Sequence, residues 1–223
     1  MAIYIIIMNK AIYKTLILLT CTMLMACQGG KDNAPSKETA PKQTVKQKVT
    51  VREIRLYLYD DFPAKKARML ADALKDVYPS VSIHKDFLSL PKEYYNKERN
   101  RYSGTGLLKD LGKLRKGNAV LGLTEEVIFK ANELSPTCGI FGVSTLGTYV
   151  AVISSTRPSG KQHTNDHLVK LMMHELGHSF GLNHCSNQHC FMVDAEHGDK
   201  FSQTPSFCNK CKAFLNNNEW NIK

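Results

Sequence analysis

The sequence predicts an α/β (α+β) fold in which a mixed, twisted sheet packs on helices. Short segments that are apolar or that alternate apolar and polar residues, as strands do, are separated by segments with the apolar spacing of a helix. The chain has 223 residues, of which 43% are hydrophobic and 22% are charged. This length is enough for one domain with a core, and the composition excludes a fibrous or wholly disordered protein.

The first residues are predicted to be a targeting signal and not part of the folded domain. Lys10 and Lys14 precede a short apolar run, which suits the core of a signal peptide better than a membrane-spanning helix. The stretch LMAC at residues 24–27 resembles the lipobox of bacterial lipoproteins. We expect residues 1–27 to be a lipoprotein signal peptide and the protein to be exported. A lipid on Cys27 would anchor it to a bacterial membrane, on the periplasmic or cell-surface face. An uncleaved anchor and an ordinary secretory signal are the alternatives.

Residues 28–48 are rich in Lys, Gln, Thr, Pro and Ser and lack aromatic residues. Such a segment cannot bury enough apolar surface to fold, so it is predicted to be a flexible tether. The formal net charge of the chain is +10. About half of that charge lies in the first 48 residues, so residues 49–223, the predicted domain, carry a mild excess. We therefore expect no nucleic-acid partner.

Within the domain, each element is predicted from its own pattern. Residues 49–59 alternate as a half-buried strand does, and residues 63–78 carry a helical apolar stripe that a proline ends. Residues 92–115 have helical propensity, interrupted near Gly104 and Gly106. We further predict strands at 81–85, 119–123, 138–143 and 148–154, and an active-site helix at about 165–181.

The predicted active-site helix carries the stretch HELGHSFGLNH, which runs from His174 to His184. On a helix, His174 and His178 lie on one face and can hold one metal ion, while Glu175 points to a neighbouring sector. A straight helix would carry His184 too far along its axis. Gly181 supplies the necessary bend, because glycine adopts the left-handed conformation that ends helices at little steric cost.

This set of residues predicts a catalytic zinc site. Three neutral imidazoles leave one position open for water, whose pKa zinc lowers to about 7, and Glu175 is placed to take its proton. We therefore predict an enzyme, a zinc metallopeptidase that hydrolyses peptide bonds in a peptide or protein substrate. Whether it is an aminopeptidase or an endopeptidase does not follow. The alternatives are a zinc-containing peptide-binding lipoprotein with little turnover and a zinc hydrolase of non-peptide amides.

The pattern HExxHxxGxxH is the metzincin signature. Here the run continues as HC-x4-C-x-M-x15-C-x-x-C, and residues 174–211 resemble the archaemetzincin family. The resemblance implies a metzincin-like zincin fold with a small zinc-stabilised C-terminal subdomain, and two zinc ions per chain, one catalytic and one structural. It implies that three histidines bind the catalytic zinc, that Glu175 is the general base, that Met192 forms the Met-turn, and that four cysteines bind the structural zinc. The histidines are His174, His178 and His184, and the cysteines are Cys185, Cys190, Cys208 and Cys211.

Two interpretations of the four clustered cysteines stay open. In an exported protein the default is two disulfides. The spacing of Cys208 and Cys211, and the start of the other pair directly after a metal-binding histidine, favour zinc instead. Cys138 remains as a lone thiol on a predicted strand, where we expect it to be buried.

The strand predicted at residues 138–143 has two interpretations. It is either an edge strand along which a peptide substrate lies antiparallel, as in metzincins, or a strand of the core. We expect the protein to be a monomer.

Overall fold

The computed structural model describes residues 50–60, 62–130, 139–194 and 200–223. The predicted signal peptide, the lipidation site Cys27, the tether and Cys138 lie outside these residues. Among the helices of the described part, none is long and apolar enough to cross a membrane.

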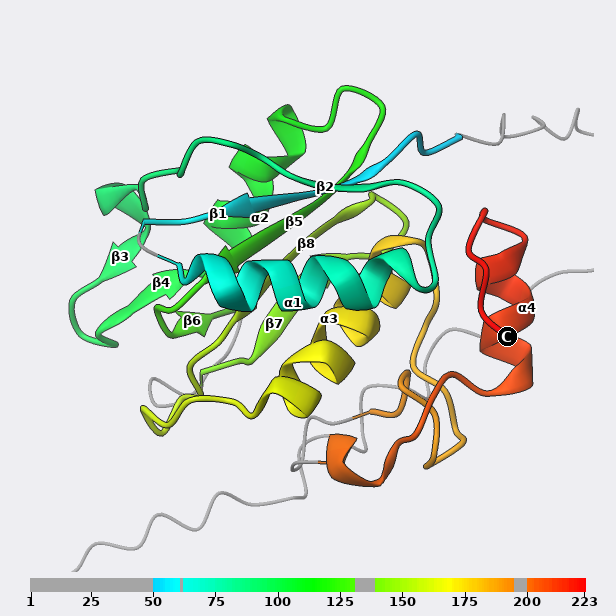
Figure 1. The fold of residues 1–223 in the computed structure, drawn as a ribbon. Coiled ribbons are helices and arrows are strands. Elements are labelled where there is room, and N and C mark those ends of the chain that lie inside the picture. The colour runs from blue at the N-terminus through cyan, green and yellow to red at the C-terminus, as the bar shows by residue number, and fades with distance from the viewer. Residues whose placement is uncertain (1–49, 61, 131–138, 195–199) are drawn as a thin grey trace, which may run out of the picture. The chain divides into compact units, whose positions relative to one another are not determined.

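A five-stranded sheet forms the centre of the domain (Figure 1). Its order is β2-β1-β5-β8-β7, and neighbouring strands are parallel except for the antiparallel pair β7 and β8. The central strand β5 is buried along its whole length, which explains its continuous apolar sequence. The bounds are β1 Ile54–Leu58, β2 Val81–Ile83, β5 Ala119–Thr124, β7 Gly142–Thr145 and β8 Val150–Ser154.

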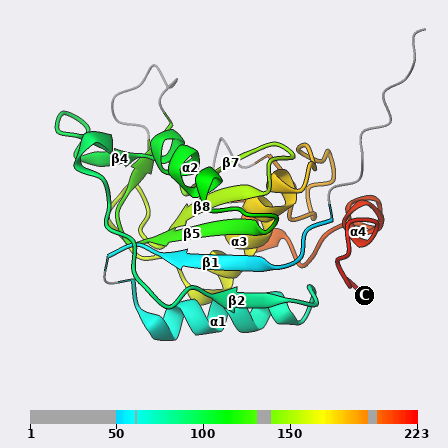
Figure 2. The same cartoon turned by 90° about the horizontal axis from the view of Figure 1, so that it is seen from above.

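Helices cover both faces of the sheet. Figure 2 shows α1 (Ala64–Lys75) below the strands and α2 (Gly104–Lys113) above them. Helix α3 (Asn165–Ser179) shares the hydrophobic cluster of α1. Along β1 the side chains alternate accordingly, because Leu56 belongs to the hydrophobic cluster of α1 and α3 whereas Tyr57 belongs to that of α2. The predicted mixed sheet packed on helices is therefore confirmed.

The region 92–115 differs from its prediction as one interrupted helix. It contains a 3-10 turn at Lys92–Tyr94, the strands β3 (Tyr95–Asn96) and β4 (Arg101–Ser103), and then α2. With β6 (Ile128–Phe129), β3 and β4 form a small second sheet. The glycines mark the start of α2, where the Ser103 hydroxyl caps the helix by accepting the N–H of Gly106 at 3.2 Å.

The edge strand β7 is shifted along the chain from its predicted position at 138–143. Among the described residues before it, Ile140 forms only an isolated bridge to Ile128, and the regular pairing with β8 begins at Gly142. Within the described part of the chain, β7 pairs with β8 alone, so its other edge is open.

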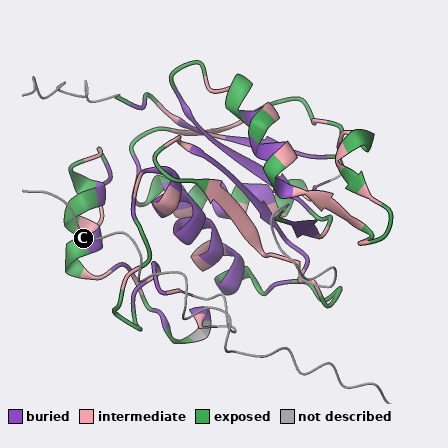
Figure 3. Cartoon of the chain, turned by 180° about the vertical axis from the view of Figure 1, so that it is seen from behind, coloured by how far each residue is buried: buried purple, intermediate pink, exposed green. Residues whose placement is uncertain are grey.

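Helix α3 is the most deeply buried helix, as Figure 3 shows by its nearly continuous purple ribbon. Beyond it, the chain forms a 3-10 turn at Phe201–Gln203 and the helix α4, Asn209–Asn216. Trp220, after α4, packs edge-on against Tyr78 and Phe180, and the N–H of Asn221 donates to the carbonyl of Val77 at 2.8 Å. These contacts attach the C-terminal segment to α1 and to the end of α3.

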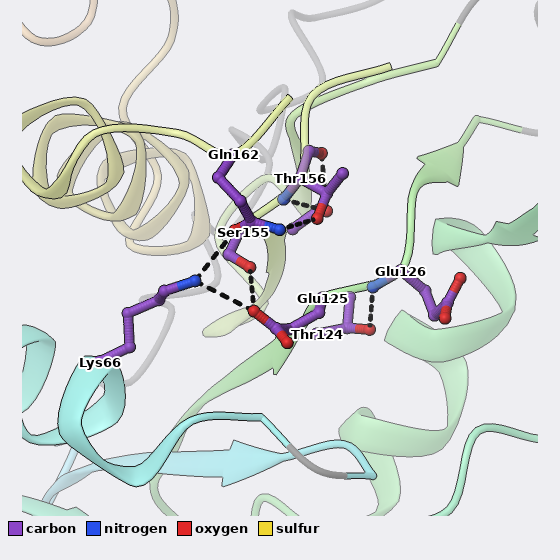
Figure 4. Close-up of polar contacts among 8 residues, drawn as sticks. Lys66, Thr124, Glu125, Glu126, Ser155, Thr156 and Gln162 are labelled. Carbon is purple, nitrogen blue, oxygen red and sulfur yellow. Dashed lines mark hydrogen bonds and ion pairs between the residues drawn. The ribbon is translucent and has the colours of Figure 1, made fainter. Parts of the chain in front are cut away.

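A polar cluster joins the start of α1 to the carboxyl ends of β5 and β8 (Figure 4). The ammonium of Lys66 donates to Glu125 Oε1 at 3.0 Å and to Gln162 Oε1 at 2.9 Å. The hydroxyl of Ser155 donates to the same carboxylate oxygen at 3.2 Å. Lys66 therefore connects three segments that are far apart in the sequence.

We expect Lys66→Met to lower the free energy of unfolding by about 1 kcal/mol, because it removes a partly shielded ion pair and a hydrogen bond but keeps the aliphatic stem. Urea unfolding of the metal-loaded protein measures the change. Lys65→Met is the matched control, because Lys65 is exposed on the same turn of α1. Equal stability of the two variants would contradict the role of Lys66.

Candidate metal centre

Three histidines converge at the C-terminal part of α3. The helix begins at the N-cap Thr164, whose hydroxyl accepts the N–H of His167, and it carries His174 and His178 near its end. The nitrogen atoms that these two residues and His184 offer to a metal all lie within 4.8 Å of one another. The structure thus brings the three histidines together, as their spacing in the sequence predicts.

The turn after α3 brings the third histidine into place. Gly181 has a φ of +111°. Its N–H donates to the carbonyl of His178, and the N–H of Leu182 donates to the carbonyl of Gly177, both at 2.9 Å. This pair of bonds is a Schellman motif, which satisfies the last carbonyls of the helix and reverses the chain. His184 therefore folds back toward the helix instead of continuing along it.

Backbone carbonyls set the orientation of two of the imidazoles. Nδ1 of His174 lies 2.7 Å from the carbonyl oxygen of Phe191, and Nδ1 of His178 lies 2.6 Å from that of Leu182. A carbonyl can only accept, so both Nδ1 atoms carry the proton and both Nε2 atoms present lone pairs. The two Nε2 atoms are 3.1 Å apart. Lone pairs facing one another at this distance repel unless a cation lies between them, so the donor set fits a metal ion.

Burial favours the neutral form of His174 and His178. Burial, together with the neighbouring His178, lowers the pKa of His174 to about 3. Burial also lowers the pKa of His178. His184 is exposed, and its Nδ1 lies 3.8 Å from a carboxylate oxygen of Asp194. Neutral imidazoles are the form that binds zinc.

Glu175 lies beside the histidines but outside their group of ligand atoms. Its side chain is buried, and the hydroxyl of Ser144 on β7 donates to its Oε2 at 2.8 Å. Burial raises the pKa of Glu175 to about 7, against the opposing effects of the Ser144 hydrogen bond and of Lys130. A Cβ atom on Gly142 would lie 2.9 Å from Glu175 Oε1, so the glycine leaves room for this carboxylate.

Met192 is fully buried under α3. A Cβ atom on Gly177 would overlap the Met192 sulfur. The absence of a side chain at Gly177 therefore lets the Met192 side chain pack directly against the helix backbone. The carbonyl of Met192 accepts the N–H of Cys185 at 2.7 Å. The loop after His184 is thereby held against the underside of α3.

The four cysteines form a second group. The sulfur atoms of Cys185, Cys190, Cys208 and Cys211 all lie within 4.8 Å of one another, and all four thiols are free. The sulfur of Cys190 accepts the N–H of Met192 at 3.4 Å and that of Cys208 at 3.3 Å. Such N–H to sulfur bonds stabilise a thiolate. The structure thus contains the four-thiol arrangement and none of the alternative disulfides.

Four deprotonated thiols this close together would repel one another. Burial, and then the charge of Cys190, raise the pKa of Cys211. For Cys208, burial acts in the same direction, but the N–H of Cys211 and the neighbouring sulfurs lower its pKa to about 7. Four sulfurs within 4.8 Å of one another fit a zinc ion, because the cation offsets the repulsion.

Backbone groups link the two sites, and sequence reasoning did not find them. Phe191 lies between Cys190 and Met192, its carbonyl accepts from His174, and its N–H donates to the carbonyl of Ser206 at 3.0 Å. Backbone carbonyls carry no residue-specific signal. The contact of Ser144 with Glu175 was also missed, since 31 positions separate the two residues.

The class of zinc metallopeptidases called metzincins is defined by three features. A helix carries two histidines and a glutamate, a turn at a glycine brings a third histidine beside them, and a mixed sheet lies next to the helix. A model of Peptidase family M54 matches residues 69–217. The chain therefore belongs to peptidase family M54, the archaemetzincins, and is a zinc metallopeptidase. The resemblance found in the sequence is confirmed.

Individual relatives agree with this assignment. The archaemetzincin of Methanopyrus kandleri is 32% identical over 144 residues, which are 62% of this chain and 79% of that protein. The archaemetzincin of Aeropyrum pernix is 27% identical over 166 residues, or 69% and 88% of the two chains. The crystal structure of the Methanopyrus kandleri protein matches with a TM-score of 0.62 and 26% identity, covering 78% of this chain and 98% of that one. The crystal structure of the archaemetzincin of Archaeoglobus fulgidus, complexed with malonate, matches with a TM-score of 0.60 and 25% identity, covering 73% of this chain and 99% of that one.

We expect Gly181→Ala to weaken zinc binding at the histidines by about tenfold or more, because an L side chain at this φ costs about 1–3 kcal/mol and the turn relaxes with His184. Competition with a chelator measures the affinity. Gly160→Ala is the matched control, since Gly160 also has a positive φ, +80°, with no atom within 4 Å of an added Cβ. If both variants bind zinc as the unmodified protein does, the bend at Gly181 does not govern the site.

Proposed function

We propose that this chain is a peptidase in which His174, His178 and His184 hold the catalytic zinc and Glu175 is the general base. The observation that carries the proposal is the facing pair of Nε2 lone pairs, fixed by carbonyls on the Nδ1 side, next to a buried carboxylate. Histidines that served only to pack the core would not need lone pairs directed at one point.

Zinc at the three histidines would polarise the scissile carbonyl and make water more acidic. Ser144 holds Oε2 of Glu175, so Oε1 is left to accept a proton from the attacking water. The same carboxyl group then delivers this proton to the nitrogen of the departing amine. Its burial favours both steps, since a carboxylate with a raised pKa takes up a proton more readily and holds it until the amine leaves.

The open edge of β7 supports a peptide substrate. An extended peptide can pair antiparallel to this strand, and main-chain hydrogen bonds would then align its carbonyl groups with the site. The strand borders Glu175 through Gly142 and Ser144, so a paired peptide passes beside the general base. This edge favours a peptide substrate over the non-peptide amides of one alternative. The buried Glu175 beside it favours turnover over the other alternative, a peptide-binding lipoprotein with little turnover.

The four-cysteine group is proposed to hold a second, structural zinc, which makes two zinc ions per chain. Met192 is proposed to form the Met-turn beneath the catalytic site, in agreement with its burial against Gly177.

We further propose that the protein is an exported monomer anchored to a bacterial membrane by lipid on Cys27, on the strength of the sequence at residues 1–27. Mass spectrometry of the membrane fraction tests the lipid on Cys27 directly.

We expect Glu175→Gln to retain both zinc ions and to lower kcat by about 100-fold or more, because the amide cannot carry the proton. Elemental analysis and a peptide cleavage assay measure the two effects. A chelator control on the unmodified protein separates this metallopeptidase activity from contaminating proteases. Hydrolysis at the normal rate by the variant would exclude Glu175 as the base.

We expect His184→Ala to reduce the zinc content from two ions to one, leaving the ion on the cysteines. Elemental analysis under non-reducing conditions, with a count of reactive thiols, measures the change. Cobalt substitution identifies which site remains loaded, because only the cysteine site gives thiolate charge-transfer absorption. Loss of the four thiols as disulfides would refute the structural zinc site and leave the catalytic one standing.

A further inference from the structure

A hollow of about 310 Å³ lies between α2 and the far end of the β7 and β8 hairpin. One stripe of α2 forms one wall, and residues of the hairpin form the other. Gly112 keeps the α2 wall low, since an added Cβ there would meet nothing within 4 Å. The lining residues are Thr105, Leu108, Lys109, Gly112, Thr145, Thr148 and Val150.

Alternation along β7 relates this hollow to the metal centre. Gly142 and Ser144 face Glu175 on the α3 side of the sheet. Val143 faces α2, where a Cβ on Gly104 would come within 2.7 Å of it. Thr145, two positions further, also points to the α2 side and lines the hollow. A single edge strand thus borders the catalytic carboxylate on one face and the hollow on the other.

The hairpin end that carries the hollow is fixed to the metal-binding helix. The N–H of Gly147 donates to the carbonyl of His178 at 3.1 Å, and the N–H of Tyr149 donates to that of Ser179 at 2.8 Å. The position of the hollow relative to the histidines is therefore set by backbone hydrogen bonds and does not depend on a free loop.

We propose that the hollow is a substrate subsite that accepts one acidic side chain, preferably glutamate, of a peptide paired with β7. The inference rests on the proposed function. Residues directly opposite one another in an antiparallel pair point to the same face, so the substrate residue opposite Thr145 directs its side chain to the hollow. Its neighbours in the peptide point to the metal side.

The residues that line the hollow indicate which kind of side chain it accepts. Leu108 and Val150 offer an apolar floor for methylene groups, and the hydroxyl of Thr145 can donate to a carboxylate. The hydroxyl of Thr148 donates to the carbonyl of Thr145 at 2.8 Å. Lys109 contributes the single charge of the lining. The adjacent Asp110 does not cancel this charge, because it pairs with Lys113 at 2.6 Å.

The test is a set of ten-residue peptides with neutral side chains, made both with free and with blocked N-termini, in which one glutamate or one lysine is moved through every position. The zinc-loaded protein cleaves them, and kcat/KM is measured for each. We expect glutamate to raise kcat/KM about fivefold at one position relative to the scissile bond, through KM, and lysine to lower it there. A flat profile over all positions would overturn the proposal.

Two variants locate the effect. Lys109→Glu should reverse the preference at that position, and Gly112→Leu, which fills the hollow, should abolish the preference for any long side chain there. Lys75→Glu is the charge-matched control, since Lys75 is exposed on α1 across the sheet, and it should keep the glutamate preference. Persistence of this preference in Lys109→Glu would refute the subsite.

A failure of the proposed function has a different outcome. If the zinc-loaded protein cleaves none of the peptides, the proposed function fails. Binding of the same peptides, now carrying a fluorescent label, is then measured by anisotropy. Tighter binding of the glutamate peptide, lost in Lys109→Glu, would still support the subsite. Equal binding of all the peptides would overturn the subsite as well.

Discussion

The orientation of His174 and His178 by two backbone carbonyls is the constraint on which the site depends. Each imidazole could rotate about its side chain, but a carbonyl that can only accept fixes the proton on Nδ1 and directs Nε2 to the common point. These carbonyls belong to Leu182, in the Schellman turn, and to Phe191, in the loop of the cysteines. The chain after α3 therefore orients His174 and His178 as well as bringing His184 beside them.

The sequence was sufficient for the class of fold and for the groups at the two centres. The spacing from His174 to His184 and the glycine between them define the geometry almost completely, because helical pitch and a left-handed turn leave few other arrangements. The strand order, the small second sheet and the contact of Ser144 with Glu175 could not be predicted in this way. They arise from tertiary pairing between distant segments, for which one sequence has no periodic signal. The roles of the three histidines, of Glu175, of Met192 and of the four cysteines, and the lipid on Cys27, remain predictions.

The two centres are not independent parts. Phe191 contributes its carbonyl to His174 while its neighbour Cys190 belongs to the sulfur cluster, so a change in that cluster reaches a histidine through a single residue. Trp220 and Phe180 connect the same C-terminal segment to the end of α3. A metal at the cysteines would thus stabilise the shape of the other site as well as the tail.

The open edge of β7 also bears on how copies of the chain meet. A free strand edge is a template for any extended segment, including the same strand of another molecule. Here the strand has only four residues, Gly142–Thr145, and its neighbour in the sheet is antiparallel. So short an edge would hold another copy by few main-chain bonds, whereas a peptide that used the proposed subsite would add contacts of its own. Brevity of the strand is thus compatible with a protein that binds extended chains without assembling into fibres.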